Sequence, residues 1–160
     1  MEARINYSKV DPEGIAAFYH LQQYTAHCGL EHSLLELVKM RSSQLNGCAF
    51  CLDMHSKDAR LAGETEQRLY TLSAWRETPF FTDRERAALA WTEAITLIAD
   101  HHPDDALYNE ARQYFSEKEL VDLTLAIITI NGWNRLSIAF HTPAGSYQPA
   151  GAHAEPAAAR

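Results

Sequence analysis

The amino-acid sequence predicts an all-α domain with about six or seven helices. Helix start and stop signals recur along the chain, apolar residues repeat at helical spacing, and strand-like alternation of apolar and polar residues is scarce. With 160 residues, the chain is sized for one domain that buries a real core. Its composition, 46% hydrophobic and 22% charged, is typical of a globular protein rather than a disordered or fibrous one.

Four helices are expected in the first half of the chain, each bounded by a capping residue, a proline or a glycine. Asp11 followed by Pro12 is typical of an N-cap with proline at the first helical position. Asn46 and Gly47 are typical of a helix end, directly before the cysteines. The expected ranges are about 12–28, 31–46, 48–63 and 65–75.

Three more helices are expected in the second half of the chain. Thr82 with Glu85, and Ser116 with Glu119, have the spacing of capping boxes. Behind the first box, apolar residues form a helical stripe that consists of Ala88, Trp91, Ile95 and Ile98. The expected ranges are about 82–98, 103–114 and 116–140.

The last of these helices is apolar on nearly all sides. Its length and capping box favour a helix over a strand despite the β-branched run, and its apolar character predicts burial in the core or at a subunit interface. Asn131, Trp133 and Asn134 interrupt the apolar run. The sequence leaves open whether these residues make a buried polar contact or form the wall of a pocket.

Residues 1–142 form the predicted helical domain. From Pro143 onward the composition shifts to Ala, Pro and Gly, with almost nothing to bury. We therefore expect residues 143–160 to be a disordered tail.

Charge and hydropathy exclude several kinds of partner. The net charge is −7 and the basic residues are interspersed with acidic ones, so no basic stripe is available for nucleic acid or an anionic membrane. The N-terminus has no signal-peptide pattern, and no segment approaches the ~18 consecutive apolar residues of a membrane span. We expect a cytoplasmic protein, in which a close cysteine pair is catalytic, redox-sensing or metal-binding rather than a structural disulfide.

The stretch NGCAFCLDMH, residues 46–55, places two cysteines and a histidine close together. On a helix that begins at Cys48, the side chains of Cys48, Cys51 and His55 share one face with Leu52 and Ala59. Charged residues occupy the opposite face. Both sulfurs and the imidazole are therefore expected to point inward, toward a neighbouring helix.

Three features could activate a thiol here: the start of the helix, His55, and a carboxylate that orients this histidine. The first two favour different sulfurs. The positive end of the helix dipole favours an anion at Cys48, whereas His55 lies one turn from Cys51 and could take its proton. The residues alone leave the nucleophile undecided. A Cys48–Cys51 disulfide fits the helical spacing, but its four-residue loop would add only about 2 kcal/mol of stability, so the bond would be more useful as one that forms and breaks.

The cysteine pair is also compatible with roles other than redox chemistry. A zinc site needs a second ligand pair, and the nearest candidate is His101 with His102 in a predicted loop. Leu52, not histidine, follows the second cysteine, which excludes covalent haem. A noncatalytic zinc-holding oligomeric module and accidental core packing are the remaining alternatives, and Cys28 is expected to be a small buried hydrophobic residue.

The spacing of Glu36, Cys48, Cys51 and His55 resembles the signature of the AhpD-like alkylhydroperoxidases, a group within the carboxymuconolactone decarboxylase superfamily. The resemblance extends from the first predicted helix to Phe140. It implies an AhpD-like helical bundle that forms homo-oligomers, commonly trimers or hexamers. It also implies a thiol peroxidase for hydrogen peroxide or small organic hydroperoxides, with no cofactor and no bound metal.

The resemblance also implies a role for each residue. Taken alone, Glu36 beside Lys39 is typical of a solvated surface pair, but the resemblance implies that Glu36 faces the cysteine helix and relays protons with His55. Cys51 is implied to attack the peroxide, and Cys48, expected to be the more exposed sulfur, to close the disulfide. A thiol or dithiol, such as a lipoyl-type or thioredoxin-like protein, would then restore the pair. A close alternative is a disulfide reductase or redox relay that uses the same residues.

Overall fold

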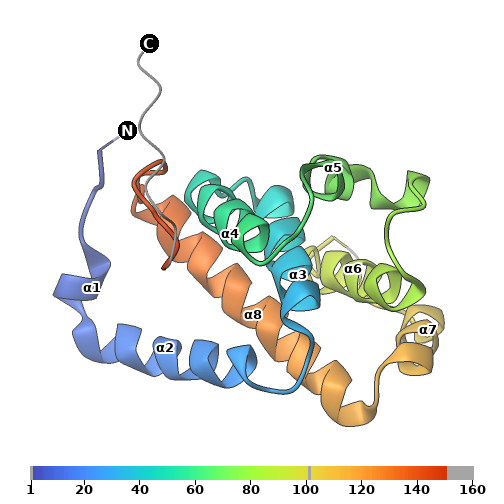
Figure 1. Ribbon diagram of the computed structural model, residues 1–160. Coiled ribbons are helices and arrows are strands. Elements are labelled where there is room, and N and C mark those ends of the chain that lie inside the picture. Colours follow the sequence, from blue (N-terminus) through green and yellow to red (C-terminus); the bar gives the residue numbers. More distant parts are fainter. Residues whose placement is uncertain (1, 101, 151–160) are drawn as a thin grey trace.

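The structure is a computed structural model that describes residues 2–100 and 102–150. Within these residues it contains eight α-helices, one 3-10 helix and no strand, so the all-α prediction is confirmed (Figure 1). The helices are α1 (Tyr7–Val10), α2 (Pro12–Ala26), α3 (His32–Asn46), α4 (Ala49–Leu61), α5 (Glu66–Thr71), η1 (Leu72–Glu77), α6 (Asp83–Thr96), α7 (Asp105–Tyr114) and α8 (Glu117–Ala139).

The long helix α8 runs diagonally through the molecule, and α2, α3, α4 and α6 pack against it (Figure 1). Its capping box forms as expected, because the Ser116 hydroxyl accepts from the Glu119 backbone and the Glu119 carboxylate accepts from the Ser116 backbone. Leu123 and Ile127 of α8 are fully buried in an apolar cluster with α3, α6 and α7. A second apolar cluster joins α3, α4, α5, η1 and α6, so α3 lies between the two.

The α3–α4 connection determines where the cysteines lie. Gly47 ends α3 in the left-handed region with φ 68°, a conformation that costs glycine little. The backbone N–H of Cys48 then bonds the carbonyl of Ser43 at 3.0 Å. This tight reversal lets α4 start at once and pack along α3.

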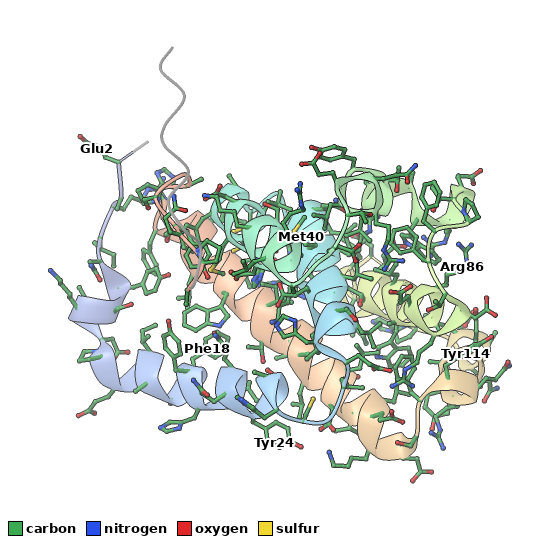
Figure 2. All side chains as sticks on the ribbon, viewed as in Figure 1. Glu2, Phe18, Tyr24, Met40, Arg86 and Tyr114 are labelled. Atoms are coloured by element: carbon green, nitrogen blue, oxygen red, sulfur yellow. The ribbon has the colours of Figure 1, made fainter. Side chains whose placement is uncertain are left out.

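The N-terminal helix α2 contacts α8 through a close helix–helix approach. A Cβ atom at Gly132 would lie only 2.3 Å from Cζ of Phe18, so any other residue there would displace the Phe18 ring. The Phe18 ring packs against Trp133 in a tilted arrangement, with ring centroids 4.7 Å apart. Figure 2 shows Phe18 where α2 faces α8.

The helix boundaries differ from the predicted ones in three places. The additional helix α1 is a single turn, capped by the Asn6 side chain, and is too short to give a periodic signal. The helix expected over 65–75 is divided into α5 and η1, with non-helical dihedrals at Ala74. Helix α6 ends at Thr96, so Ile98 of the predicted stripe lies beyond it and is 48% exposed.

The segment 143–150, which lies in the predicted tail, runs along α4 as an ordered strap. The Gly145 N–H donates to Asp53 at 3.0 Å, the Lys57 ammonium donates to the Tyr147 carbonyl at 2.9 Å, and the Tyr147 hydroxyl donates to Asp58 at 2.7 Å. The rest of the predicted tail, residues 151–160, lies outside the described residues. In the described part of the chain, none of the helices has the length and apolarity needed to cross a bilayer.

Candidate active site

The two cysteines begin helix α4. Cys48 is its N-cap residue and Cys51 lies in its first turn. Cys51, His55 and Ala59 are the buried residues of α4, so the inward face has the predicted members. The expectation that Cys48 is the more exposed sulfur is wrong, because both residues are only 1% exposed where Ile130 packs against them.

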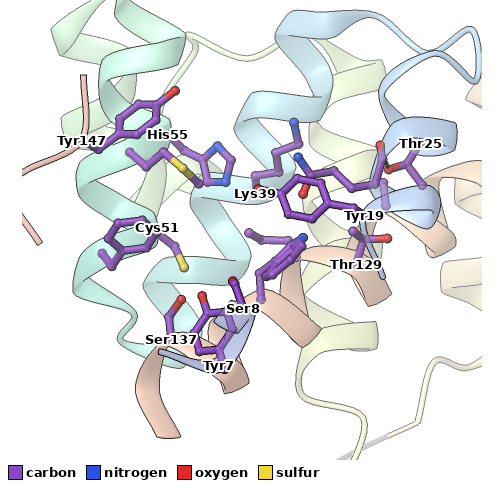
Figure 3. A pocket seen from close by; sticks show the side chains of 16 residues that line it. Tyr7, Ser8, Tyr19, Thr25, Lys39, Cys51, His55, Thr129, Ser137 and Tyr147 are labelled. Carbon is purple, nitrogen blue, oxygen red and sulfur yellow. Dashed lines mark hydrogen bonds between the residues drawn. The ribbon is translucent and has the colours of Figure 1, made fainter. Parts of the chain in front are cut away.

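A cavity of about 270 Å³ opens beside Cys51. Cys51 and His55 both line it, whereas Cys48 does not (Figure 3). Its walls come from five helices, α1, α2, α3, α4 and α8, and from the strap. The aromatic residues among them are Tyr7, Tyr19, Phe50, Trp133 and Tyr147. A small, mainly apolar molecule that enters this cavity therefore meets the sulfur of Cys51 first.

The buried carboxylate of Glu36 holds the imidazole of His55. Oε2 of Glu36 lies 3.0 Å from Nδ1 of His55, and Oε1 lies 2.7 Å from the ammonium of Lys39. Burial raises the pKa of Glu36, but the His55 hydrogen bond and the Lys39 ammonium outweigh it and lower that pKa to about 2. The carboxylate therefore stays charged and orients Nδ1 as a donor, which leaves Nε2 of His55 free for proton transfer.

The Lys39 pair predicted from spacing thus exists, but it is not a solvated surface feature. Glu36 is 4% exposed, so the surface interpretation of this residue is wrong. Each of its two oxygens has a different cationic or donor partner, one on α3 and one on α4.

The pKa values of the two thiols are shifted in opposite directions. The hydrogen bond from the Cys51 thiol outweighs burial and lowers the pKa of Cys48 to about 7. The same interaction, together with burial, raises the pKa of Cys51. The first negative charge therefore forms on Cys48, at the positive end of α4, while the cavity gives access to Cys51.

A metal-ligand set that includes the cysteines is absent from the described residues. The group with suitable spacing there consists of Glu36, His55 and Asp58, whose ligand atoms lie within 4.8 Å of one another. Its carboxylates already have partners, because Lys39 bonds Glu36 and the hydroxyl of Tyr147 bonds Asp58. The proposed second zinc pair cannot be placed, since His101 lies outside the described residues.

The sequence left open whether Asn131, Trp133 and Asn134 make a buried polar contact or form a pocket wall, and the structure shows both roles. Trp133 forms part of the cavity wall, whereas Asn131 and Asn134 make a buried polar contact with Asn46. Ser137 is a cavity-lining residue that gave no signal in the sequence. Cys28, expected to be buried, is only partly buried, and its thiol donates to the Thr25 carbonyl at 3.1 Å.

A helical bundle with a C-x-x-C pair at the start of a helix, a histidine one turn later and a buried glutamate behind it defines an AhpD-like protein. The sequence profile of the carboxymuconolactone decarboxylase family matches residues 12–94. The chain belongs to this family.

The relatives are similar along most of the chain. The uncharacterized protein YdfG of Bacillus subtilis is 46% identical over 146 residues, which are 91% of this chain and 99% of that protein. The crystal structure of a protein of unknown function from Agrobacterium tumefaciens, described as a candidate AhpD antioxidant-defence protein, aligns with TM-score 0.88 and 42% identity over 91% of this chain and 100% of that one. The debrominase Bmp8 shares the fold, with TM-score 0.77 and 22% identity over 86% of this chain and 74% of its own.

Proposed function

We propose that the protein is a thiol-dependent peroxidase that reduces hydrogen peroxide or small organic hydroperoxides with Cys48 and Cys51. One observation supports this most strongly: the sulfur of Cys51 lines an apolar cavity together with His55, whose Nδ1 is held by Glu36 at 3.0 Å. This places a candidate nucleophile and a candidate base at the same small space. Because both sulfurs are 1% exposed, a small peroxide fits the site better than a disulfide on the surface of a protein.

The oxidative steps balance within these residues. The pair passes one proton to Nε2 of His55, and transfer of the remaining proton from Cys51 to Cys48 gives the Cys51 thiolate. That thiolate attacks one peroxide oxygen, an S–O bond forms, the O–O bond breaks, and the leaving alkoxide or hydroxide takes the proton from His55. Cys48 then attacks the sulfenic acid, so that a disulfide forms and water leaves. The peroxide gains the two electrons that the two thiols lose.

A thiol or dithiol reductant has to restore the pair by exchange. The burial of both sulfurs favours a slender reductant that enters the cavity, such as a small dithiol or a lipoyl-type arm, over a thioredoxin-like protein that needs an exposed sulfur. We place the cycle in the cytoplasm, where thiols are kept reduced. We further propose that the chain acts as a homo-oligomer, a trimer or hexamer, as its resemblance to AhpD-like proteins implies.

Mass spectrometry after treatment with stoichiometric peroxide tests the function. Two thiols per chain should be lost and a Cys48–Cys51 disulfide should form. The Cys48→Ser variant should stop at a Cys51 sulfenic acid, which is trapped with dimedone, and Cys51→Ser should not react. The His55→Ala variant should oxidise more slowly with its fold unchanged.

Two controls make the experiment decisive. Cys28→Ser should behave like the unmodified protein, because Cys28 lies outside the cavity. Turnover on a model disulfide, measured beside turnover on peroxide, separates the peroxidase from the disulfide reductase. Thiols that stay reduced at millimolar peroxide would refute the proposal.

A further inference from the structure

Behind the cysteine pair, α8 carries two buried polar residues that the proposed relay of Glu36 and His55 does not include. Asn134 is 0% exposed and Ser137, one turn further along α8, is 5% exposed. We propose that Asn134 and Ser137 are positioning residues that donate hydrogen bonds to the sulfurs of Cys48 and Cys51 and thereby stabilise the thiolate. This inference rests on the proposed function, because it concerns the thiolate that would attack the peroxide.

The orientation of the Asn134 amide follows from a chain of donors and acceptors. Arg135, which can only donate, bonds Oδ1 of Asn131 at 2.9 Å, and the amide nitrogen of Asn131 bonds the Ile127 carbonyl at 2.9 Å. The Asn46 group that faces Oδ1 of Asn131 at 2.9 Å must therefore be its nitrogen. That nitrogen also lies 2.8 Å from Asn134, so the Asn134 atom facing it must be the acceptor Oδ1.

The nitrogen of Asn134 therefore points the other way, away from Asn46. One of its two hydrogens is donated to the Ser43 hydroxyl at 3.1 Å. The Ser43 hydroxyl is the acceptor that the described residues show for this nitrogen. A buried amide needs a partner for its second hydrogen as well, so we infer that this hydrogen is directed to the sulfur pair. The amide cannot rotate to present its oxygen to the sulfurs without breaking the bonds to Asn46 and Ser43.

The hydroxyl of Ser137 reaches the pair from the cavity side. Ser137 and Cys51 line the same cavity, and Figure 3 shows the hydroxyl and the sulfur turned toward each other. Hydrogen bonds from Asn134 and Ser137 lower the pKa of Cys48, and they also act to lower the pKa of Cys51. Both residues thus oppose the burial that disfavours either thiolate.

Fixed donors of this kind are needed because the rest of the surroundings is apolar. Ile130, Phe50 and Trp133 pack around the two sulfurs, and an anion buried among such side chains is costly unless it is hydrogen-bonded. The backbone N–H of Cys51 supplies one donor at the start of α4. Asn134 and Ser137 add donors from a second helix, and they are in place before the charge forms.

A spectroscopic titration of the thiolate tests the proposal without any peroxide. In a Cys28→Ser background, the rise in ultraviolet thiolate absorbance below the range in which tyrosine titrates, about pH 10, reports the pair. Ser137→Ala should move the first titration midpoint up by about one pH unit, which is a roughly tenfold smaller thiolate fraction below the midpoint. Ser137→Thr restores the hydroxyl and should return the midpoint.

Ser56→Ala is the matched control, since it removes the same group from α4 at a hydroxyl that bonds the Asp53 carbonyl, and its midpoint should not move. None of these variants replaces another titratable residue near the cavity. Those residues are His55 on α4, Lys39 on α3, Tyr7 on α1, Tyr19 on α2, Tyr147 on the strap and, behind Asn131, Arg135 on α8. Differences between the variants therefore report the Ser137 hydroxyl alone.

Asn134→Asp is the second variant, because it keeps the shape of the side chain while it replaces the donor nitrogen by oxygen. Its midpoint should move up further than that of Ser137→Ala. If Asn134→Asp does not fold, the Ser137 series still decides. A Ser137→Ala midpoint that coincides with the control would overturn the proposal. A shifted midpoint in a protein that does not react with peroxide would keep this inference and refute the proposed function instead.

Discussion

At the scale of single residues, the Glu36 carboxylate on α3 affects both the stability of the fold and the orientation of His55 on α4. One oxygen is bonded to Lys39 and the other to His55, while the side chain itself is buried. A carboxylate so placed must remain charged to be stable, and while charged it fixes which nitrogen of His55 is free. Stability and orientation of the site therefore depend on the same ionisation.

The Glu36→Gln variant should lose the acid sensitivity that this ionisation causes. The pKa of Glu36 is lowered from 4.5 to about 2, so its contribution to stability is complete above pH 4.5 and lost as the pH falls toward 2. The shift corresponds to about 3 kcal/mol. Urea unfolding of both proteins between about pH 7 and about pH 3 measures this, and the stability difference should shrink as the pH falls.

A Lys57→Met variant is the control for that comparison, because its ion pair with Asp53 is partly exposed and joins neighbouring turns of α4. Lys57 also lowers the pKa of Asp53, but this pair is partly exposed, so the stability difference of Lys57→Met should change less with pH than that of Glu36→Gln. A Glu36→Gln difference that stays constant with pH would mean that the pKa of Glu36 is the same in the folded and the unfolded protein.

At the scale of elements, the strap at 143–150 forms one wall of the cavity. Tyr147 lines the cavity and is anchored at its hydroxyl by Asp58 and at its carbonyl by Lys57. Burial and the Asp58 hydrogen bond raise the pKa of Tyr147 to about 12, so the hydroxyl remains a donor at ordinary pH. The side-chain hydrogen bonds that the described residues show for the strap all go to α4, and Pro149 is its one residue that is buried within 143–150.

Truncation after Thr142 should therefore open the cavity and leave the helices folded. We expect Cys51 to react several-fold faster with a bulky maleimide, while the melting temperature changes by only a few degrees, since few buried contacts are lost. Truncation after Ala150 keeps the strap and is the matched control, with an unchanged alkylation rate. Equal rates for the two truncated chains would show that the strap does not limit access.

The same scale explains which elements the sequence could predict. The capping boxes at Thr82 and Ser116 depend only on residues three positions apart in the sequence, and both form as predicted. The kink at Ala74 and the strap depend on distant contacts, and no local pattern indicates them. Asn46 has a typical helix-end position, which concealed its second role as the donor that orients Asn134.

For the site, spacing alone placed the two cysteines and His55 on one buried face, because helical geometry determines it. The contact between Glu36 and His55 joins residues that are 19 positions apart on different helices. Periodicity cannot supply such a contact, and only the resemblance to a known family implied it. The inward direction of Cys48 was predicted, but its greater exposure than the other cysteine was not found, because Ile130 and Trp133 of α8, far along the chain, pack against both sulfurs.

At the scale of the whole molecule, the cysteine site lies apart from the two large apolar clusters in which α3 and α8 are packed. The two large apolar clusters contain neither cysteine, and the sulfurs belong to a separate small cluster with Ile130. Chemistry at the pair can therefore proceed while the main packing stays intact. A disulfide between the N-cap and the first turn of α4 closes a loop within a single turn and links no two helices.

Oxidation should consequently change global stability little. By the chain-entropy relation, a four-residue loop stabilises the folded state by at most about 2 kcal/mol, which is roughly 4 to 8 °C in melting temperature for a domain of this size. Calorimetry of the reduced and peroxide-oxidised protein measures the difference, and Cys48→Ser treated with peroxide controls for oxidation elsewhere. A rise well beyond roughly 8 °C would mark the disulfide as a structural bond. A small rise with one cooperative transition, by contrast, is what a bond that forms and breaks in each cycle requires, because neither redox state is then trapped by the fold.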